Sequence, residues 1–300
     1  MRQIKKAIMK RALKEFYALN ELEGEAYARE LAKFSKKVRK DSAPQKRVLS
    51  SLKVTKHTCE GGAFYRAVPR TYRSNKVVFY IHGGGFFLEA FDAHWSFCAR
   101  LAKRTGCEII FPEYPLVPEH NCVDTLAMLM DLYRKVLQKH SPKDVTIMGD
   151  SAGGTLALSV SLLARDRGLP PAHEIVLISP GFVVECENEK EKRRLEEIKK
   201  HDFMLGDFPI GKIQKLWIPK EDLDGPKSDV TKRDPTGLPR ITMFSGTYDI
   251  LNVPARKYYK KLKALRQSVH YVERKHGIHV YALFPSAKPE FDLIVSRVLG

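Results

Sequence analysis

The sequence predicts an α/β fold with a mostly parallel central sheet and helices on both faces. From about residue 50 to 181, short apolar runs alternate with longer helix-like segments, and this alternation resumes at Leu238. Such alternation is typical of parallel strands joined by helical crossovers. Glycine-rich turns follow two of the expected strands, where folds of this class place their functional loops. Three hundred residues are enough for one such domain.

The expected strands are short apolar runs bounded by polar residues or glycine. We predict parallel strands at 77–81, 108–111, 145–148, 174–178, 240–246 and 268–273, and an antiparallel edge hairpin over 54–68. Helices are predicted at 94–104, 123–140, 154–167, 253–265 and from about residue 288.

Two segments lie outside this alternation. Residues 182–235 form an insertion between core strands, with a charged stretch at 185–200 that predicts an exposed helix and an apolar cluster after it. Residues 1–45 are expected to be helical, because an apolar stripe recurs mostly every three or four residues: Ile4, Ile8, Phe16, Tyr27, Leu31, Phe34 and Val38. The chain is therefore divided into an N-terminal helical segment, 1–45, and a domain, 46–300, that carries the insertion.

The most informative motif is Gly-Asp-Ser-Ala-Gly at residues 149–153, a G-x-S-x-G pattern. It follows an expected buried strand and precedes an expected helix. A serine on such a tight turn is held in an exposed, strained position, where its hydroxyl can attack a carbonyl. The pattern alone is weak, but this context favours Ser151 as a nucleophile.

A second glycine-rich turn, His-Gly-Gly-Gly at residues 82–85, follows the strand expected at 77–81. Three consecutive glycines are costly in a plain connector. They are useful where backbone N–H groups must approach a substrate oxygen, together with the N–H of Ala152 after the serine. The alternative is a flexible glycine-rich loop.

An acid and a base are expected after the serine, in that order. Asp249 follows the strand expected at 240–246, and His279 follows the next strand, after Gly277 and before an apolar run. Asp249 could instead cap the next helix, and His276 is the rival base. His270 alternates with apolar residues inside a strand, which favours a structural role. Rival aspartates in a polar segment are Asp222, Asp224, Asp229 and Asp234.

As a set, these residues resemble the hormone-sensitive-lipase-like family of α/β hydrolases. The resemblance covers residue 77 to the C-terminus and rests on His-Gly-Gly-Gly at 82–85, Tyr-Pro-Leu-Val-Pro-Glu-His at 114–120, Gly-Asp-Ser-Ala-Gly-Gly at 149–154, Asp-Ile-Leu at 249–251, and His279. It implies the α/β-hydrolase fold, carboxylester hydrolase activity, and a helical cap over the active site. One departure is Pro115, where the family usually has an arginine.

The resemblance also implies roles for individual residues. Ser151 would be the nucleophile, His279 the general base and then acid, and Asp249 the residue that orients the histidine. The N–H groups of Gly84, Gly85 and Ala152 would form the oxyanion hole, and His82 and Gly83 would support that loop. From their positions, five aromatic residues are expected to line the substrate pocket: Phe86, Phe87, Tyr114, Phe182 and Trp217.

The expected function is that of a serine carboxylesterase, which acts through an acyl-enzyme on short- to medium-chain acyl esters of small molecules. The alternative is a non-catalytic protein on the same fold that binds a ligand or associates with membrane surfaces. A broken triad would favour that alternative, whereas this chain has all three members. No cofactor is expected.

The net charge of +17 is concentrated near the N-terminus, because residues 1–56 carry 16 Lys and Arg against 6 Asp and Glu. This is either a solvated basic face or a weak attraction for anionic membrane surfaces. Nucleic-acid binding is not expected, because the basic stretch has no recognition motif and lacks interleaved stacking aromatics.

The five cysteines are scattered, without a C-x-x-C pair or a Cys/His cluster. They predict reduced thiols in a cytoplasmic protein and no metal site. The N-terminus has no uninterrupted apolar core, and no run approaches 18 apolar residues, so neither a signal peptide nor a membrane span is expected. The oligomeric state is not predicted.

Overall fold

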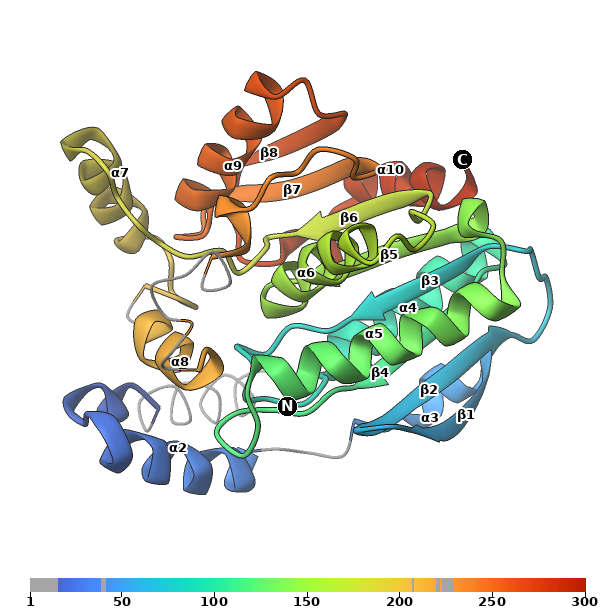
Figure 1. Cartoon of the computed structure of the whole chain (residues 1–300), viewed down its shortest axis with the longest axis horizontal. Coiled ribbons are helices and arrows are strands. Elements are labelled where there is room, and N and C mark those ends of the chain that lie inside the picture. Colours follow the sequence, from blue (N-terminus) through green and yellow to red (C-terminus); the bar gives the residue numbers. More distant parts are fainter. Residues whose placement is uncertain (1–15, 39–41, 207, 220–221, 223–228) are drawn as a thin grey trace.

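The computed structural model describes residues 16–38, 42–206, 208–219, 222 and 229–300, and an eight-stranded sheet forms its centre (Figure 1). The strand order is β1-β2-β4-β3-β5-β6-β7-β8. Strand β2 is antiparallel to β1 and β4, and all other neighbours are parallel. The strands are β1 (Leu52–Cys59), β2 (Gly62–Pro69), β3 (Val77–Ile81), β4 (Glu108–Glu113), β5 (Val145–Asp150), β6 (Glu174–Ile178), β7 (Arg240–Tyr248) and β8 (Val269–Ile278). The predicted mostly parallel sheet and its edge hairpin are confirmed.

Helices cover both faces of the sheet, as predicted. Side chains alternate across a strand, so Phe79 and Tyr80 in β3 enter different core clusters. The Phe79 cluster includes residues of α5 (Cys122–Lys139), α6 (Ala152–Asp166) and α9 (Asn252–Ala264). The Tyr80 cluster includes residues of α4 (Asp92–Thr105) and α10 (Lys288–Leu299). Because both faces are covered, β3, β5 and β6 are entirely buried, and apolar residues predominate in them.

Most predicted helices and strands differ from the observed ones by one to three residues at an end. The largest difference is β8, which continues to Ile278 rather than ending at residue 273. Strand β7 ends at Tyr248, immediately before Asp249, so both β7 and β8 end one residue before a candidate catalytic side chain. Short helical segments complete this part of the chain: α3 (Lys46–Leu49), η2 (Pro142–Asp144) and η5 (Tyr281–Leu283).

The N-terminal segment is helical over most of its described residues, as expected, and a break divides it. A short turn, η1 (Leu19–Glu21), is separated from α2 (Gly24–Val38), and Gly24 has φ +53°, in the left-handed region. That conformation redirects the chain between the two pieces. The apolar stripe of α2 does face inward, with Tyr27 and Leu31 buried. Ile4 and Ile8 lie outside the described residues.

The insertion between β6 and β7 contains α7 (Glu189–Lys199), α8 (Ile210–Trp217) and η4 (Val230–Lys232). Helix α7 buries only Ile198, in agreement with the predicted exposed helix. Helices α2, α7 and α8 lie beyond the carboxyl ends of the central strands (Figure 1). Among the described helices, none combines the length and apolar character needed to cross a membrane.

Candidate active site

Ser151 occupies the turn between β5 and α6 with φ +51° and ψ −125°. A non-glycine residue with such backbone angles costs about 1–3 kcal/mol, so the surrounding packing must hold it. Glycine makes that packing close: a Cβ on Gly153 would lie 2.0 Å from the carbonyl oxygen of Ile81, and one on Gly149 would lie 2.1 Å from that of Gly153. The β5–α6 turn therefore presses directly against the end of β3.

The structure brings Ser151, His279 and Asp249 together. The Ser151 hydroxyl lies 2.9 Å from His279 Nε2, and His279 Nδ1 lies 2.9 Å from Asp249 Oδ2. Asp249 can only accept at neutral pH, so Nδ1–H donates to it and Nε2 is left to accept the serine proton. Asp249 is fully buried and also accepts a hydrogen bond from the Leu251 N–H at 3.0 Å.

The rival residues do not occupy the positions of this triad. His276 is exposed and packs on the ring of Tyr248, with ring centroids 4.7 Å apart. His270 contacts Arg297 at 2.8 Å. Asp222 and Asp229 line the same cavity as Ser151, but the aspartate hydrogen-bonded to His279 is Asp249. Asp234 accepts from Thr236, and Asp224 lies outside the described residues.

Two glycines explain how the acid and base loops come close. A Cβ on Gly246 in β7 would lie 2.1 Å from the carbonyl oxygen of Gly277 in β8. The register between these strands also shifts between Gly246 and Tyr248. Without side chains at this contact, the ends of β7 and β8 can approach closely enough for Asp249 and His279 to share a hydrogen bond.

The electrostatic surroundings of His279 raise its pKa. Burial alone would lower the pKa, because it disfavours the imidazolium. The charge and hydrogen bond of Asp249 outweigh burial, with smaller contributions from Asp202 and Asp150. The site is thus arranged to stabilise a protonated His279.

Asp150, next to Ser151, holds the glycine-rich loop. Its buried carboxylate accepts hydrogen bonds from the Tyr80 hydroxyl at 2.7 Å, the Gly83 N–H at 3.1 Å and His94 Nε2 at 3.2 Å. Burial would raise the pKa of Asp150, but the interactions with His94 and Tyr80 lower it on balance. Sequence reasoning missed this role, although an acidic residue at the end of a buried apolar strand was a signal that could have revealed it.

His82 also supports the glycine-rich loop. Its Nδ1–H donates to the Gly83 carbonyl at 2.7 Å, and burial lowers its pKa to about 4, so the ring is neutral. Tyr114 stacks on this ring at 4.5 Å and donates to the His82 carbonyl at 2.7 Å. Tyr114 is therefore not a pocket residue, which corrects the prediction: its buried ring braces the loop and does not line the cavity.

The N–H groups of Gly84, Gly85 and Ala152 are available to a ligand. Among the described residues, no hydrogen bond from any of these three groups is present. Ala152 is the first residue of α6, and the N–H at that position has no partner within a helix. All three residues line the same cavity as Ser151, where the partial positive charge of the α6 N-terminus also favours an anion.

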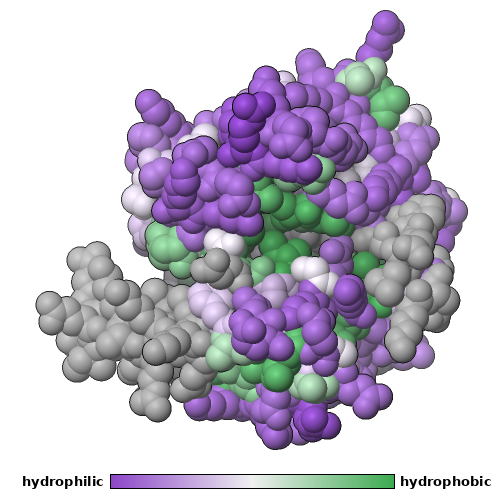
Figure 2. Space-filling view, turned by 90° about the vertical axis from the view of Figure 1, so that its left-hand side faces the viewer, coloured by the Kyte–Doolittle hydropathy of each residue, from purple (hydrophilic) through white to green (hydrophobic). Residues whose placement is uncertain are grey.

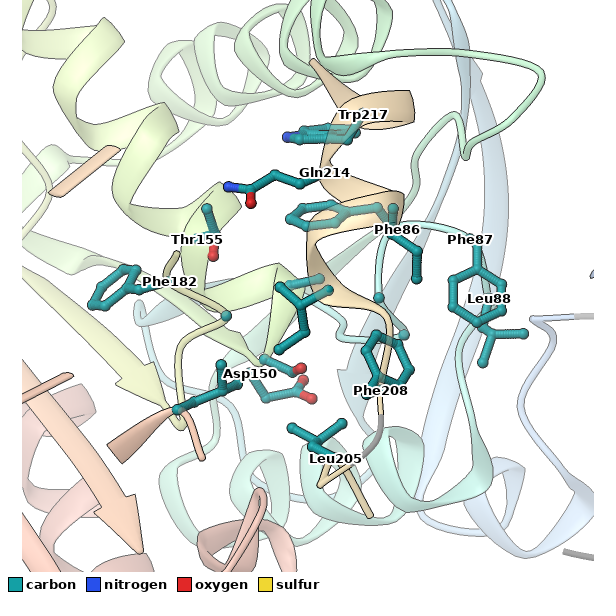
Figure 3. A pocket seen from close by; sticks show the side chains of 18 of the residues that line it. Phe86, Phe87, Leu88, Asp150, Thr155, Phe182, Leu205, Phe208, Gln214 and Trp217 are labelled. Carbon is teal, nitrogen blue, oxygen red and sulfur yellow. The ribbon is translucent and has the colours of Figure 1, made fainter. Parts of the chain in front are cut away.

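An apolar cavity of about 1010 Å³ surrounds Ser151, and the surface above it is hollowed and hydrophobic between hydrophilic rims (Figure 2). In the close view, Phe86 and Trp217 lie across the cavity from Thr155 and Phe182 (Figure 3). The predicted pocket residues that line it are Phe86, Phe87, Phe182 and Trp217. Beyond the residues predicted for the pocket, the N-terminal segment contributes Phe16 and Phe34, and the apolar cluster of the insertion contributes Leu205 and Phe208.

No group of three or more His, Cys, Asp or Glu side chains in the described part of the chain is arranged to hold a metal ion. The groups that meet at the site are a serine hydroxyl, an imidazole and a carboxylate, beside backbone N–H donors.

Comparison with known proteins agrees with this architecture. The profile of the alpha/beta hydrolase fold family matches residues 78–283. An esterase of Acinetobacter venetianus is 29% identical over 221 residues, which are 72% of each chain. The crystal structure of an esterase/lipase from an uncultured bacterium has a TM-score of 0.74 at 25% identity, covering 89% of this chain and 90% of that one. An esterase of the bacterial hormone-sensitive lipase family has a TM-score of 0.76 at 19% identity, covering 97% and 96%.

The fold and the matched profile define the class: the chain belongs to the α/β hydrolase family. The predicted resemblance to esterases of this family is confirmed, and the fold is shared with an esterase of the bacterial hormone-sensitive lipase family.

The close contact at the serine turn gives a testable expectation. Gly153→Ala should lower the free energy of unfolding by about 3 kcal/mol, because the new methyl group would displace backbone rather than a flexible side chain. Urea unfolding monitored by circular dichroism measures this. Gly211→Ala in α8 is the control, since nothing lies within 4 Å of its added Cβ. Equal stabilities of the two variants would contradict the packing argument.

Proposed function

We propose that this carboxylesterase-type hydrolase cleaves short- to medium-chain acyl esters through an acyl-enzyme formed on Ser151. The observation that carries the proposal is the continuous hydrogen-bonded chain from Ser151 through His279 to Asp249, beside unpaired backbone donors. In this proposal Ser151 is the nucleophile, His279 the general base and acid, and Asp249 the residue that orients the imidazole.

In the acylation step, His279 Nε2 takes the hydroxyl proton while Ser151 Oγ attacks the ester carbonyl carbon. The N–H groups of Gly84, Gly85 and Ala152 stabilise the negative charge that develops on the carbonyl oxygen. The imidazolium, stabilised by Asp249, then protonates the departing alkoxide, so the alcohol leaves and the acyl group stays on Ser151.

In the deacylation step, His279 removes a proton from a water molecule, which attacks the acyl carbonyl. The same donors stabilise the second oxyanion, and the proton held by His279 returns to Ser151 Oγ as the acid is released. One imidazole therefore serves both half-reactions.

The N-terminal segment and the 182–235 insertion are proposed to form the cap of this site. Both supply apolar walls to the cavity, and they contact each other through Phe16 and Phe208, whose ring centroids are 5.1 Å apart. On α6, cavity-lining residues recur every four positions from Ser151 through Thr155 and Ser159 to Leu163, so one helix face extends the cavity by about 18 Å. An acyl chain that lies along this face would be shielded from water.

A cytoplasmic location is also proposed, since all five cysteines are free thiols. A weak attraction to anionic membranes is proposed from the basic residues near the N-terminus and from exposed apolar side chains that line the cavity. Phe91, Val123 and Phe203 are 48%, 56% and 61% exposed. No nucleic-acid partner is proposed.

Ser151→Ala should abolish hydrolysis of p-nitrophenyl esters while leaving the circular dichroism spectrum unchanged, because the nucleophile is removed without altering the fold. Loss of the nucleophile typically costs about 10⁶ in kcat. Wild-type kcat/KM should be highest among esters between acetate and decanoate and fall towards palmitate. Substantial hydrolysis by the variant, or a maximum at palmitate, would contradict the respective part of the proposal.

The raised pKa of His279 fixes the direction of the pH dependence. Only neutral His279 accepts the serine proton, so kcat/KM should fall as pH is lowered through a pKa above the ordinary histidine value. Asp249→Asn should reduce kcat about 10⁴-fold and move this acidic limb to lower pH, because the group that raises the pKa loses its charge. An acidic limb at or below the ordinary value in the wild type would be evidence against this account.

Membrane attraction should appear as salt-sensitive pelleting with vesicles that contain about one third phosphatidylserine, because screening weakens exposed charge interactions. Neutral phosphatidylcholine vesicles are the control. If the protein stays in the supernatant with both vesicle types at low salt, the proposed attraction is absent.

A further inference from the structure

Two residues of the insertion contact both neighbours of Asp249. The ring of His201 stacks on Tyr248, with centroids 4.4 Å apart and an interplanar angle of 13°. Asp202 Oδ2 accepts a hydrogen bond from the Ile250 N–H at 2.8 Å. The residues immediately before and after Asp249 are therefore both held by the short segment that follows α7.

The Asp202 carboxylate is buried, and both of its oxygens accept hydrogen bonds. Its side chain is 5% exposed, and Oδ1 accepts from the N–H groups of Met204 at 3.0 Å and Leu205 at 2.8 Å. A buried carboxylate is costly unless it is hydrogen-bonded, and here both oxygens are. Removing it would leave the buried Ile250 N–H without its acceptor.

The geometry of the peptide unit makes this contact relevant to the triad. The Ile250 N–H and the Asp249 carbonyl belong to one planar peptide group. Fixing the N–H therefore fixes the orientation of the Asp249 backbone, from which its carboxylate reaches His279. Tyr248 also connects this segment to the loop that carries the base, because its ring packs on His276, three residues before His279.

The segment that carries Asp202 is itself tied to the N-terminal part of the chain. The Tyr17 hydroxyl donates to the Met204 carbonyl at 3.0 Å, and the Met204 N–H donates to Asp202. A chain of contacts therefore runs from the N-terminal segment through the insertion to the acid of the triad.

We propose that Asp202 is a positioning residue of the catalytic site: it orients Asp249, and through it His279, when the insertion is seated on the core. This inference rests on the proposed function for its kinetic consequences, although the position of Asp249 can be measured without any substrate. If the insertion moved away from the core, the Ile250 N–H would lose its acceptor and Asp249 would be held less firmly. Full activity therefore requires the insertion to be packed on the core.

Charge provides a second way to observe this role. The carboxylates that act on His279 are Asp249 from the end of β7, Asp202 from the insertion and Asp150 from β5. Burial and the neighbouring Asp249 raise the pKa of Asp202 itself, and three backbone N–H donors favour its ionised form. Loss of its charge should make His279 easier to deprotonate, which a purely structural turn residue would not do.

The test compares Asp202→Ala and Asp202→Asn with Asp234→Asn in the same insertion. Asp234 also caps a turn, but it is exposed, and its carboxylate accepts from Thr236 rather than from a neighbour of Asp249. The measurements are kcat and KM for p-nitrophenyl butyrate across pH, thermal unfolding, and the downfield proton NMR signal of the His279 Nδ1–H shared with Asp249. Asp249→Asn, which should lose that signal, is the positive control.

Asp202→Ala should lower kcat by about tenfold or more, with KM changed less than about threefold, and should weaken or shift the NMR signal. Asp202→Asn keeps an acceptor, so its loss of kcat should be smaller, and its acidic limb should move to lower pH. Asp234→Asn should leave kcat and the pH profile unchanged. If Asp202→Ala does not fold, the pH profile and NMR signal of Asp202→Asn decide alone.

Unchanged kcat, pH profile and NMR signal in the folded Asp202 variants would overturn the inference. A loss of thermal stability as the only effect in the Asp202 variants would also overturn it, because the Asp234→Asn control could show the same loss. A wild type without ester hydrolysis would count against the proposed function alone, because the NMR signal still reports whether Asp202 orients the Asp249–His279 pair.

Discussion

The arrangement of this site depends on one buried carboxylate, Asp150. It is the last residue of β5, immediately before the serine turn, and it accepts hydrogen bonds from Tyr80 in β3 and from the Gly83 N–H. The strained serine and the glycine-rich loop are therefore fixed to a common point. Because a buried charge is tolerated only with these donors in place, any displacement of the loop is opposed by the cost of leaving Asp150 unsatisfied.

Near Asp150, the surroundings of His82 and His279 shift the pKa values of these two histidines in opposite directions. His82 is buried beside His94 and has its pKa lowered to about 4, so it serves as a neutral brace for the loop. His279 is equally enclosed, but carboxylates surround it and raise its pKa. One buried imidazole is thus held in its neutral form and the other is stabilised in its protonated form. Only His279, which faces Ser151, is suited to carry a proton during the reaction.

The features that could be predicted from the sequence are those that local sequence patterns encode. The parallel strands, the serine turn and the positions of Asp249 and His279 after strand ends all follow from apolar periodicity and motif spacing. Tyr114 was misplaced because its position beside the motif does not reveal which way its ring points. Asp202 was missed because its partner lies 48 residues later in the chain. These features depend on packing between distant segments, which a local pattern does not contain.

The contacts between the N-terminal segment and the insertion have a consequence for biosynthesis. Tyr17 and its acceptor on Met204 are 187 residues apart, and Phe16 packs on Phe208. At about 5–20 residues per second, a ribosome needs roughly 10–40 seconds to make the second partner after the first. During that interval the apolar stripe of α2 has emerged without the surface that later buries it. During that time the nascent chain therefore offers an apolar binding site for chaperones.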